Sequence, residues 1–206
     1  MIEKKKIFFN KKILIYGLGK TGTSSYKFLK KNNKVFLFDD YKKTLINKKT
    51  IVKSNFDYIL ISPGININQC ILKNHIKNNL KKIITDLDVF YSFYSENLNI
   101  SITGTNGKST TAKILFHILK DQKKDVRLVG NIGNAILNEK KISEKTIFVI
   151  EISSYQIEYS KVFKANYAAI LNIAPDHLER HGTFNNYVKA KFKLLKNQKK
   201  RSYAFL

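Results

Sequence analysis

Apolar runs and helical stretches alternate along the chain. Apolar runs that end at glycine, proline or a polar residue predict buried strands at residues 12–16, 35–38, 57–62, 83–84, 100–103, 146–150, 168–171 and 202–206. Between these runs, apolar residues at helical spacing predict helices at residues 23–31, 87–94, 109–120 and 187–195. Strands that alternate with helices are typical of parallel sheets with crossover helices, so the predicted fold class is α/β.

The alternation restarts once along the chain. A first cycle closes with the helix at residues 87–94, and a new strand, loop and helix begin at Asn99. We therefore predict two domains: a Rossmann-like parallel-sheet domain over residues 1–94 and a P-loop-type α/β domain over residues 95–206.

Composition is that of a globular protein. Hydrophobic residues make up 43% of the 206 residues, enough to build a packed core. No apolar stretch approaches the ~20 residues that a membrane helix requires, and the one cysteine, Cys70, cannot form an internal disulfide. We therefore predict a cytoplasmic protein with no membrane partner, in which Cys70 and His75 have structural roles.

The formal net charge of +23 is typical of proteins that bind nucleic acids. However, only three of the 38 basic residues are arginine, the residue that reads bases and phosphates through paired hydrogen bonds. The lysines are also scattered through every segment. We interpret them as solvated surface, predict no nucleic-acid partner, and expect their field to attract small anionic ligands.

A first glycine-rich loop, residues 17–22 (GLGKTG), stands between a predicted strand and a predicted helix. Glycines allow a tight turn and the close approach of a diphosphate, whose charge meets N–H groups at the helix start. Asp39 follows at the end of the next strand, where an acid commonly binds ribose hydroxyls. The loop predicts a nucleotide site, with a nicotinamide dinucleotide or a purely structural turn as alternatives.

A second loop, residues 103–110 (TGTNGKST), again follows a strand and opens a helix. In such loops the backbone N–H groups surround phosphates, the lysine reaches the terminal ones, and a hydroxyl ligates Mg²⁺. The general P-loop has a glycine where this chain has Ile102, so the loop is a shortened variant. We predict an ATP or GTP site here.

The shortened loop resembles that of the Mur ligase and folylpolyglutamate synthetase superfamily. Residues 17–24 and 62–65 (SPGI) resemble the UDP-binding first domain of the D-glutamate-adding Mur ligases. Motifs of the central ATPase domain follow in the family's order and spacing, at residues 130–133 (GNIG), 151–156 (EISSYQ) and 176–181 (DHLERH). Residues 187–191 (YVKAK) match the segment whose final lysine is carbamylated in these enzymes. The resemblance extends over almost the whole chain, from about residue 12 to residue 196.

The resemblance implies an ATP-dependent ligase of peptidoglycan precursor synthesis. In the family reaction, the L-alanyl carboxylate of UDP-N-acetylmuramoyl-L-alanine attacks the γ-phosphate of ATP. The amine of D-glutamate then displaces the resulting acyl phosphate. Each stage concentrates negative charge, so the protein supplies metal ions, a lysine and dipoles rather than a nucleophile.

The resemblance also implies roles for individual residues. Lys108 would neutralise the β- and γ-phosphates, and Ser109 and Glu151 would hold one Mg²⁺ ion. His177 and a carbamylated Lys191 would hold a second. The implied ATP-binding residues are Gly104, Thr105, Asn106, Gly107, Lys108, Ser109 and Thr110. The alternatives are that Glu151 and Lys191 are plain solvated surface groups; without the family match, His177 would more often be a surface or satisfied histidine.

Substrate contacts are implied in both domains. The positions matching the UDP pocket are Gly19, Thr21, Asp39, Ser62 and Gly64. The positions matching contacts to the muramoyl-alanine end are Asn131, Ser153 and Gln156. The chain departs from the family at residues 40–41 (DY), where a threonine and an arginine often stand beside the uracil and ribose.

Family members continue well beyond the last residue of this chain. We therefore expect an incomplete central domain, no D-glutamate-binding third domain, and no turnover by this chain alone; the complete protein would be a monomer. The alternatives are a non-catalytic fragment that binds UDP-sugar and ATP, another member of the superfamily, and a nicotinamide oxidoreductase. The last would leave residues 104–110 unexplained.

Overall fold

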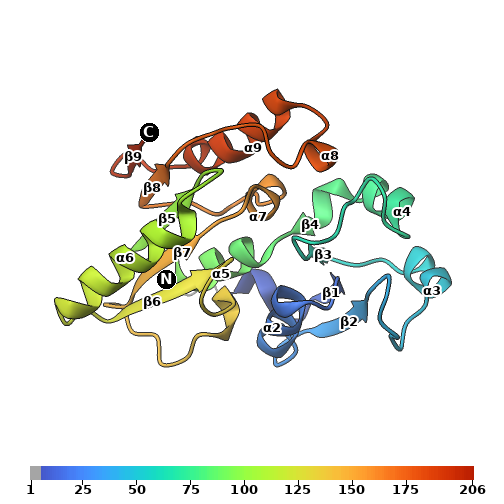
Figure 1. Ribbon diagram of the computed structural model, residues 1–206. Coiled ribbons are helices and arrows are strands. Elements are labelled where there is room, and N and C mark those ends of the chain that lie inside the picture. Colours follow the sequence, from blue (N-terminus) through green and yellow to red (C-terminus); the bar gives the residue numbers. More distant parts are fainter. Residues whose placement is uncertain (1–5) are drawn as a thin grey trace.

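The computed structural model describes residues 6–206 and contains two parallel β-sheets with helices packed against them (Figure 1). The first sheet and its helices occupy the blue to green part of the chain, and the second occupies the part from lime to red. Helices α2 and α5 lie where the two parts meet. The predicted α/β class is confirmed.

The first sheet has four parallel strands in the order β2-β1-β3-β4. Four of the five residues of the central strand β1 are buried, as its sequence KILIY requires of a strand covered on both faces. The elements of this part are η1 (Lys6–Phe8), β1 (Lys12–Tyr16), α2 (Lys20–Leu29), β2 (Lys34–Phe38), α3 (Lys48–Lys53), β3 (Tyr58–Ile61), α4 (Lys73–Asn78), η2 (Leu80–Lys82), β4 (Ile83–Ile84) and α5 (Asp86–Tyr94).

The second sheet has five parallel strands in the order β6-β7-β5-β8-β9. Its last strand, β9, pairs with β8 through Tyr167 and Tyr203, whose rings stack with centroids 5.3 Å apart. The elements of this part are β5 (Asn99–Thr103), α6 (Lys108–Asp121), β6 (Val126–Gly130), η3 (Ile136–Asn138), β7 (Ile147–Glu151), α7 (Ser154–Glu158), β8 (Tyr167–Ile170), α8 (Leu178–His181), α9 (Phe184–Lys196) and β9 (Tyr203–Phe205).

All eight predicted strands are present, each within one residue of its expected ends. Two predicted helices begin three residues earlier than expected. Helix α2 starts at Lys20 because Gly19 takes the extended N-cap conformation, and α9 starts at Phe184 because the Thr183 side chain caps it. Strand β6 was not predicted because Arg127 interrupts its apolar run, and the short helices α3, α4, α7 and α8 carry too few apolar residues for a periodicity.

Helix α5 packs against both sheets. Its residues Leu87, Val89 and Phe90 are fully buried in one hydrophobic cluster that includes residues of β1 and β7. The Phe90 ring lies edge-on to the ring of Phe148 in β7, with centroids 4.8 Å apart. The two sheets therefore share a continuous core. The expected domain boundary after residue 94 falls at the end of this helix and stays a prediction.

A buried carboxylate on α5 joins the two parts. Asp88 is 1% exposed, and its Oδ2 accepts hydrogen bonds from the backbone N–H and the hydroxyl of Thr85. Its Oδ1 accepts from the hydroxyl of Ser160 and from the N–H groups of Lys161 and Val162, at 2.7–2.9 Å. One oxygen thus caps α5, and the other anchors the loop that leads into β8.

The helices of the described part of the chain are short. The longest, α6, has 14 residues, and none from residue 6 onward is both long and apolar enough to cross a membrane.

Cys70 is buried in the same hydrophobic cluster as Ile67, Leu72 and Ile76, which includes residues of the first sheet. This burial agrees with a structural role.

The substitution Asp88→Asn should lower the free energy of unfolding by about 2–4 kcal/mol, because it removes the charge that five donors share and turns one oxygen into a donor. Urea unfolding followed by circular dichroism measures the change. Asp121→Asn, at an exposed position at the end of α6, is the matched control and should stay within about 0.5 kcal/mol of the parent. Equal unfolding midpoints for both variants would contradict a role for Asp88 in joining the sheets.

Candidate functional site

The second glycine loop connects the buried strand β5 to helix α6. Gly104 has a φ angle of 152° and Gly107 one of 82°, and α6 begins at the residue after Gly107. Asn172, just beyond β8, holds the loop from the side: its carbonyl accepts from the N–H of Thr105 at 3.0 Å and its side-chain oxygen from the N–H of Asn106 at 2.8 Å. The first N–H groups of α6 have no intrahelical acceptors, which suits them to a phosphate.

Two lysines donate to carbonyls of this loop. Lys108 Nζ lies 2.7 Å from the carbonyl oxygen of Thr105, and Lys191 Nζ lies 2.8 Å from that of Gly104. Lys191 is 1% exposed. Its place in the site was predicted only from the family resemblance. Burial, and next the nearby charge of Lys108, lower its pKa from the usual 10.5 to about 8. Of the two lysines, Lys191 is therefore partly deprotonated near neutral pH.

Glu151, the last residue of β7, lies 1% exposed next to the loop. Its Oε2 accepts from the hydroxyl of Ser109 at 2.8 Å, and its Oε1 from the side-chain amide of Asn131 at 2.9 Å. The backbone around it is tight, because a Cβ on Gly130 would lie 2.2 Å from the Glu151 carbonyl oxygen. The structure thus brings Ser109, Asn131 and Glu151 into contact with one another, whereas the resemblance had paired only Ser109 with Glu151.

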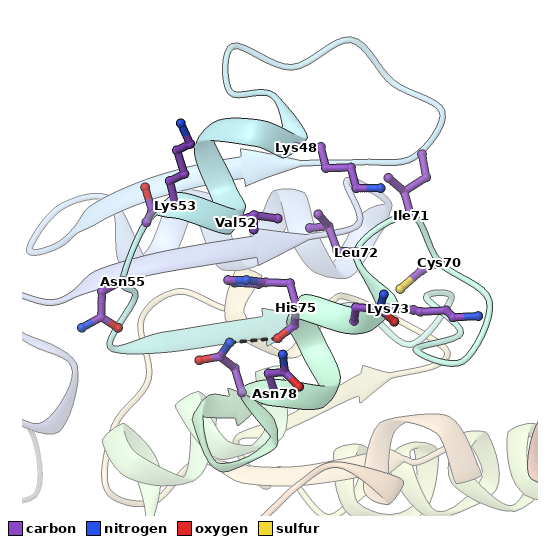
Figure 2. A pocket seen from close by; sticks show the side chains of 13 residues that line it. Lys48, Val52, Lys53, Asn55, Cys70, Ile71, Leu72, Lys73, His75 and Asn78 are labelled. Atoms are coloured by element: carbon purple, nitrogen blue, oxygen red, sulfur yellow. Dashed lines mark hydrogen bonds between the residues drawn. The ribbon is translucent and has the colours of Figure 1, made fainter.

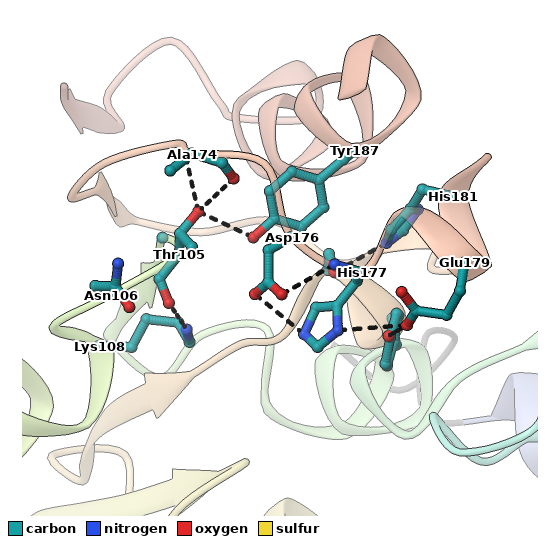
Figure 3. A network of polar contacts seen from close by, with 12 residues as sticks. Thr105, Asn106, Lys108, Ala174, Asp176, His177, Glu179, His181 and Tyr187 are labelled. Carbon is teal, nitrogen blue, oxygen red and sulfur yellow. Dashed lines mark hydrogen bonds and ion pairs between the residues drawn. The ribbon is translucent and has the colours of Figure 1, made fainter. Parts of the chain in front are cut away.

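His177 lies on the other side of the loop, in the network of Figure 3. It has a positive φ of 54° and is the N-cap residue before α8, and its ring is near the carboxylates of Asp176 (3.4 Å) and Glu179 (3.7 Å). Tyr187 lies between His177 and Lys191: its ring centroid is 6.4 Å from the His177 ring and 4.7 Å from Lys191 Nζ. The Tyr187 hydroxyl contacts the Thr105 hydroxyl at 3.1 Å, which ties this network to the phosphate loop.

The residues present fit one Mg²⁺ ion shared with phosphates. Among residues 6–206, no three histidine, cysteine, aspartate or glutamate side chains cluster as a metal site by themselves. Mg²⁺ bound to nucleotides, however, takes only one or two protein oxygens together with phosphates and water. The Ser109 hydroxyl and the Glu151 carboxylate supply such oxygens in contact with each other. Lys191 would offer an oxygen ligand only after carbamylation.

Ser153 and Gln156 hydrogen bond to each other at the start of α7. The Gln156 side-chain oxygen accepts from the N–H of Ser153, and the Ser153 hydroxyl accepts from the N–H of Gln156. This reciprocal pair is a capping box. The two residues implied as substrate contacts therefore also start a helix.

The first glycine loop is held closed by its own backbone. Gly22 packs so tightly that a Cβ there would lie 1.8 Å from the carbonyl oxygen of Gly17. That same carbonyl accepts from the buried Ser62 hydroxyl at 2.6 Å. Gly19 and Gly64, by contrast, have no heavy atom within 4 Å of an added Cβ, and Thr21 lies in the first turn of α2.

Asp39 fixes the glycine loop against the turn that follows β2. Its carboxylate accepts from the N–H of Leu18 at 2.6 Å and from those of Tyr41 and Lys42. Burial alone would raise the pKa of Asp39, but these donors outweigh it, so that the pKa lies below its ordinary value. Asp39 therefore shapes this loop, and any ribose contact it makes must share the carboxylate with three N–H groups.

Two side chains cross between the part of the chain around the first sheet and the part around the second. Lys20, in the first loop, donates to the carbonyl of Gly133 at 2.5 Å. Arg180, in α8, donates to the carbonyl of Pro63 at 2.9 Å. Sequence reasoning missed Arg180, Lys20 and Asn172. The position of Asn172 just after a predicted strand was an available signal, since polar residues there lie at the edge where the other loops gather.

A separate cavity of about 730 Å³ lies between α3 and α4 (Figure 2). It is lined by lysines and amides together with Cys70 and His75. None of the implied site residues lines it. The chemistry expected from the sequence therefore lies elsewhere, around the loops described above.

The comparisons with known proteins agree with this geometry. Residues 102–206 match the family described as the Mur ligase middle domain. The chain is 39% identical to the UDP-N-acetylmuramoylalanine--D-glutamate ligase of Rickettsia felis and 36% identical to that of Caldicellulosiruptor saccharolyticus, over 94% and 96% of its length. The chain belongs to the Mur ligase family. It covers 45% and 48% of those two proteins, so this Mur ligase chain spans about half the length of the curated relatives it matches.

Solved structures agree on the Mur ligase fold. The UDP-N-acetylmuramate:L-alanyl-gamma-D-glutamyl-meso-diaminopimelate ligase of Neisseria meningitides is 13% identical, with a TM-score of 0.58 over 95% of this chain and 70% of that one. The UDP-N-acetylmuramate-alanine ligase of Thermotoga maritima is 20% identical, with a TM-score of 0.53 over 95% and 49%. At these identities the likeness concerns the fold alone.

The substitution Gly22→Ala should lower the free energy of unfolding of this Mur ligase chain by about 1–3 kcal/mol, because the new methyl group meets backbone that cannot move aside. Gly64→Ala is the matched control, since a Cβ there meets nothing within 4 Å. Thermal unfolding monitored by circular dichroism separates the two. A melting temperature for Gly22→Ala as high as that of Gly64→Ala would show that the loop is not held by this contact.

Proposed function

We propose that the chain carries the UDP-substrate-binding and ATP-binding functions of a ligase that adds D-glutamate to UDP-N-acetylmuramoyl-L-alanine in peptidoglycan precursor synthesis. One observation carries this proposal. Around a single phosphate loop, Lys108, the Ser109–Glu151 pair and the buried Lys191 come together, in a chain up to 39% identical to proteins named as that ligase.

In the proposed reaction, a carboxylate oxygen of the L-alanyl group bonds to the γ-phosphorus of ATP as the bond to ADP breaks. The amine of D-glutamate then attacks the acyl carbon, inorganic phosphate leaves, and the nitrogen loses a proton. The residues of this chain neutralise the charge of the phosphates and position the reacting groups. Lys108 and the N–H groups at the start of α6 meet the phosphates, and no side chain acts as a nucleophile.

Mg²⁺, when bound, would neutralise phosphate charge as it develops. We assign one ion to Ser109 and Glu151, and a second to His177 and carbamylated Lys191. The burial of Lys191 supports the modification, because an amine whose pKa is about 8 is partly neutral near physiological pH, and only a neutral amine attacks CO₂. Carbamylation would replace a cation with the oxygen anion that a hard metal prefers.

In this proposal the substrates bind to two different regions of the chain. Residues 1–94 hold the UDP group, with Gly19, Thr21, Asp39, Ser62 and Gly64 at its pocket. Residues 95–206 hold ATP on residues 104–110 and the muramoyl-alanine end near Asn131, Ser153 and Gln156. The single cysteine and the nucleotide substrates favour a cytoplasmic location, and we propose that the complete protein is a monomer.

Calorimetric titration of the chain with UDP-N-acetylmuramoyl-L-alanine tests the proposal, with NADH as the control ligand. We expect saturable heat from the UDP-sugar and none from NADH, because the second loop and its acidic partner suit a ligase and have no role in a dehydrogenase. Binding of NADH instead of the UDP-sugar would reject the assignment of the first loop.

An ATP titration tests the second loop independently. Lys108→Met should weaken the binding of Mg²⁺ and a non-hydrolysable ATP analogue by roughly ten- to a hundredfold, the value of a lost charged hydrogen bond. Lys113→Met, at an exposed position on the same helix, should leave the affinity unchanged. Equal affinities in the two variants would contradict the role given to Lys108.

Carbamylation of Lys191 can be observed directly. At a fixed pressure of ¹³C-labelled CO₂, a carbamate carbon signal in NMR should grow from pH 6.5 to pH 8, because the neutral fraction of an amine rises as pH approaches its pKa of about 8. Lys191→Arg should lack the signal, since arginine stays charged. Lys189→Arg, at an exposed position two residues earlier, should retain it. A signal that survives in Lys191→Arg would assign the modification to another amine.

A further inference from the structure

Arg180 connects parts of the chain that are far apart in sequence. Its side chain is only 7% exposed. One terminal nitrogen donates to the carbonyl of Pro63, beside the proposed UDP pocket, at 2.9 Å. Its guanidinium also lies 4.3 Å from the ring centroid of Tyr155 in α7. A residue of the second sheet's helices is therefore buried against a loop of the first sheet.

Arg180 lies on a segment with two unusual backbone positions at its ends. Helix α8 has four residues, between His177, with a φ of 54°, and Gly182, with a φ of 77°. The His177 and Leu178 side chains are exposed, so α8 is anchored chiefly through its last two residues. His181 contacts the Ser154 hydroxyl of α7 at 3.0 Å, whereas Arg180 is the anchor that reaches the first sheet.

The anchor is incompletely paired. The second terminal nitrogen of Arg180 and the Oε2 of Glu158 are both buried, and neither has a hydrogen-bond partner among the described residues. The ion pair between Arg180 Nε and that oxygen measures 3.8 Å, about 1 Å longer than a charge-assisted hydrogen bond. Burial raises the pKa of Glu158 above its ordinary value, although Tyr159, Arg180 and Lys193 each act to lower it. The pair is therefore open in this arrangement of α7 and α8.

We infer that Arg180 is a positioning residue that makes the Ser62–Gly64 loop and the segment bearing His177 move as one unit when a ligand occupies the proposed UDP pocket. The ligand class is a UDP-sugar, held on the 62–64 loop. Tightening of that loop pulls on the guanidinium through the Pro63 carbonyl, and α8 follows until the pair with Glu158 closes. His177, three residues before Arg180, shifts with it. This coupling to His177 rests on the proposed function, whereas the link between the two segments does not.

Hydrogen exchange measured by mass spectrometry on the ligand-free chain tests the link itself. Arg180→Gln should speed exchange by roughly tenfold or more in peptides covering residues 62–66 and 178–182 together, since a charged hydrogen bond is lost from both. Arg127→Gln is the matched control, because Arg127 pairs with Asp125 and Glu139 away from both segments. It should leave their exchange unchanged. Arg180→Lys keeps the charge, and it should restore protection only in part because one ammonium cannot serve all three contacts.

Adding UDP-N-acetylmuramoyl-L-alanine tests the response. In the parent chain the ligand should slow exchange in both segments, and in Arg180→Gln only in residues 62–66. Faster exchange confined to residues 178–182, or spread evenly over the chain, would overturn the inference, as would an undiminished ligand response of α8 in Arg180→Gln. A parent chain that fails to bind the UDP-sugar would reject the proposed function, while the ligand-free experiment would still decide whether Arg180 links the two segments.

Discussion

The arrangement of the two sheets depends on the carboxylate of Asp88. An ion buried this completely costs several kcal/mol unless donors replace its lost water, and here five donors surround it. Those donors come from the start of α5 and from residues 160–162. Because α5 also fills the core between the sheets, the carboxylate sets both the depth of the helix and the path of the chain into β8. The positions of the loops beyond β8 therefore also depend on the Asp88 carboxylate.

Parallel pairing then brings the chemical groups to one edge. In the register of the second sheet, Ile102 pairs with Glu151, and Thr103 with Ile170, so β5, β7 and β8 end side by side. The phosphate loop follows the first of these strands, and Asn172 follows the last. In open parallel sheets, ligands bind at the carboxyl ends of strands because loops from different strands converge there. Ser109, Glu151 and Asn131 meet for this reason, although they are distant in sequence.

Sequence patterns predicted eight of the nine strands of the described residues and both glycine loops, because each of these rests on local chemistry. Apolar runs form buried strands, and glycines permit the positive φ angles of Gly104 and Gly107. Local sequence patterns do not predict contacts between distant segments. Nothing near Asp88 in the sequence indicates Ser160, and nothing near Arg180 indicates Pro63. Lys191 was distinguished from the other lysines by family resemblance alone, whereas its burial is a property of the folded chain. The Ser-x-x-Gln pattern at residues 153–156 was readable as a capping box, yet it was interpreted only as a substrate contact.

The two lysines at the phosphate loop suit different roles because their electrostatic surroundings differ. Both donate to loop carbonyls, but Lys108 stands at the start of α6, where the helix dipole already favours an anion and adds to its charge. Lys191 is buried behind the loop, and this burial, followed by the nearby charge of Lys108, lowers its pKa. In the proposed function, a phosphate that binds Lys108 would compete with the Thr105 carbonyl, so the ammonium would reach the ligand at the cost of one loop hydrogen bond. In the proposed function, carbamylation of Lys191 would relieve the repulsion between the two lysines and supply a metal ligand in the same step.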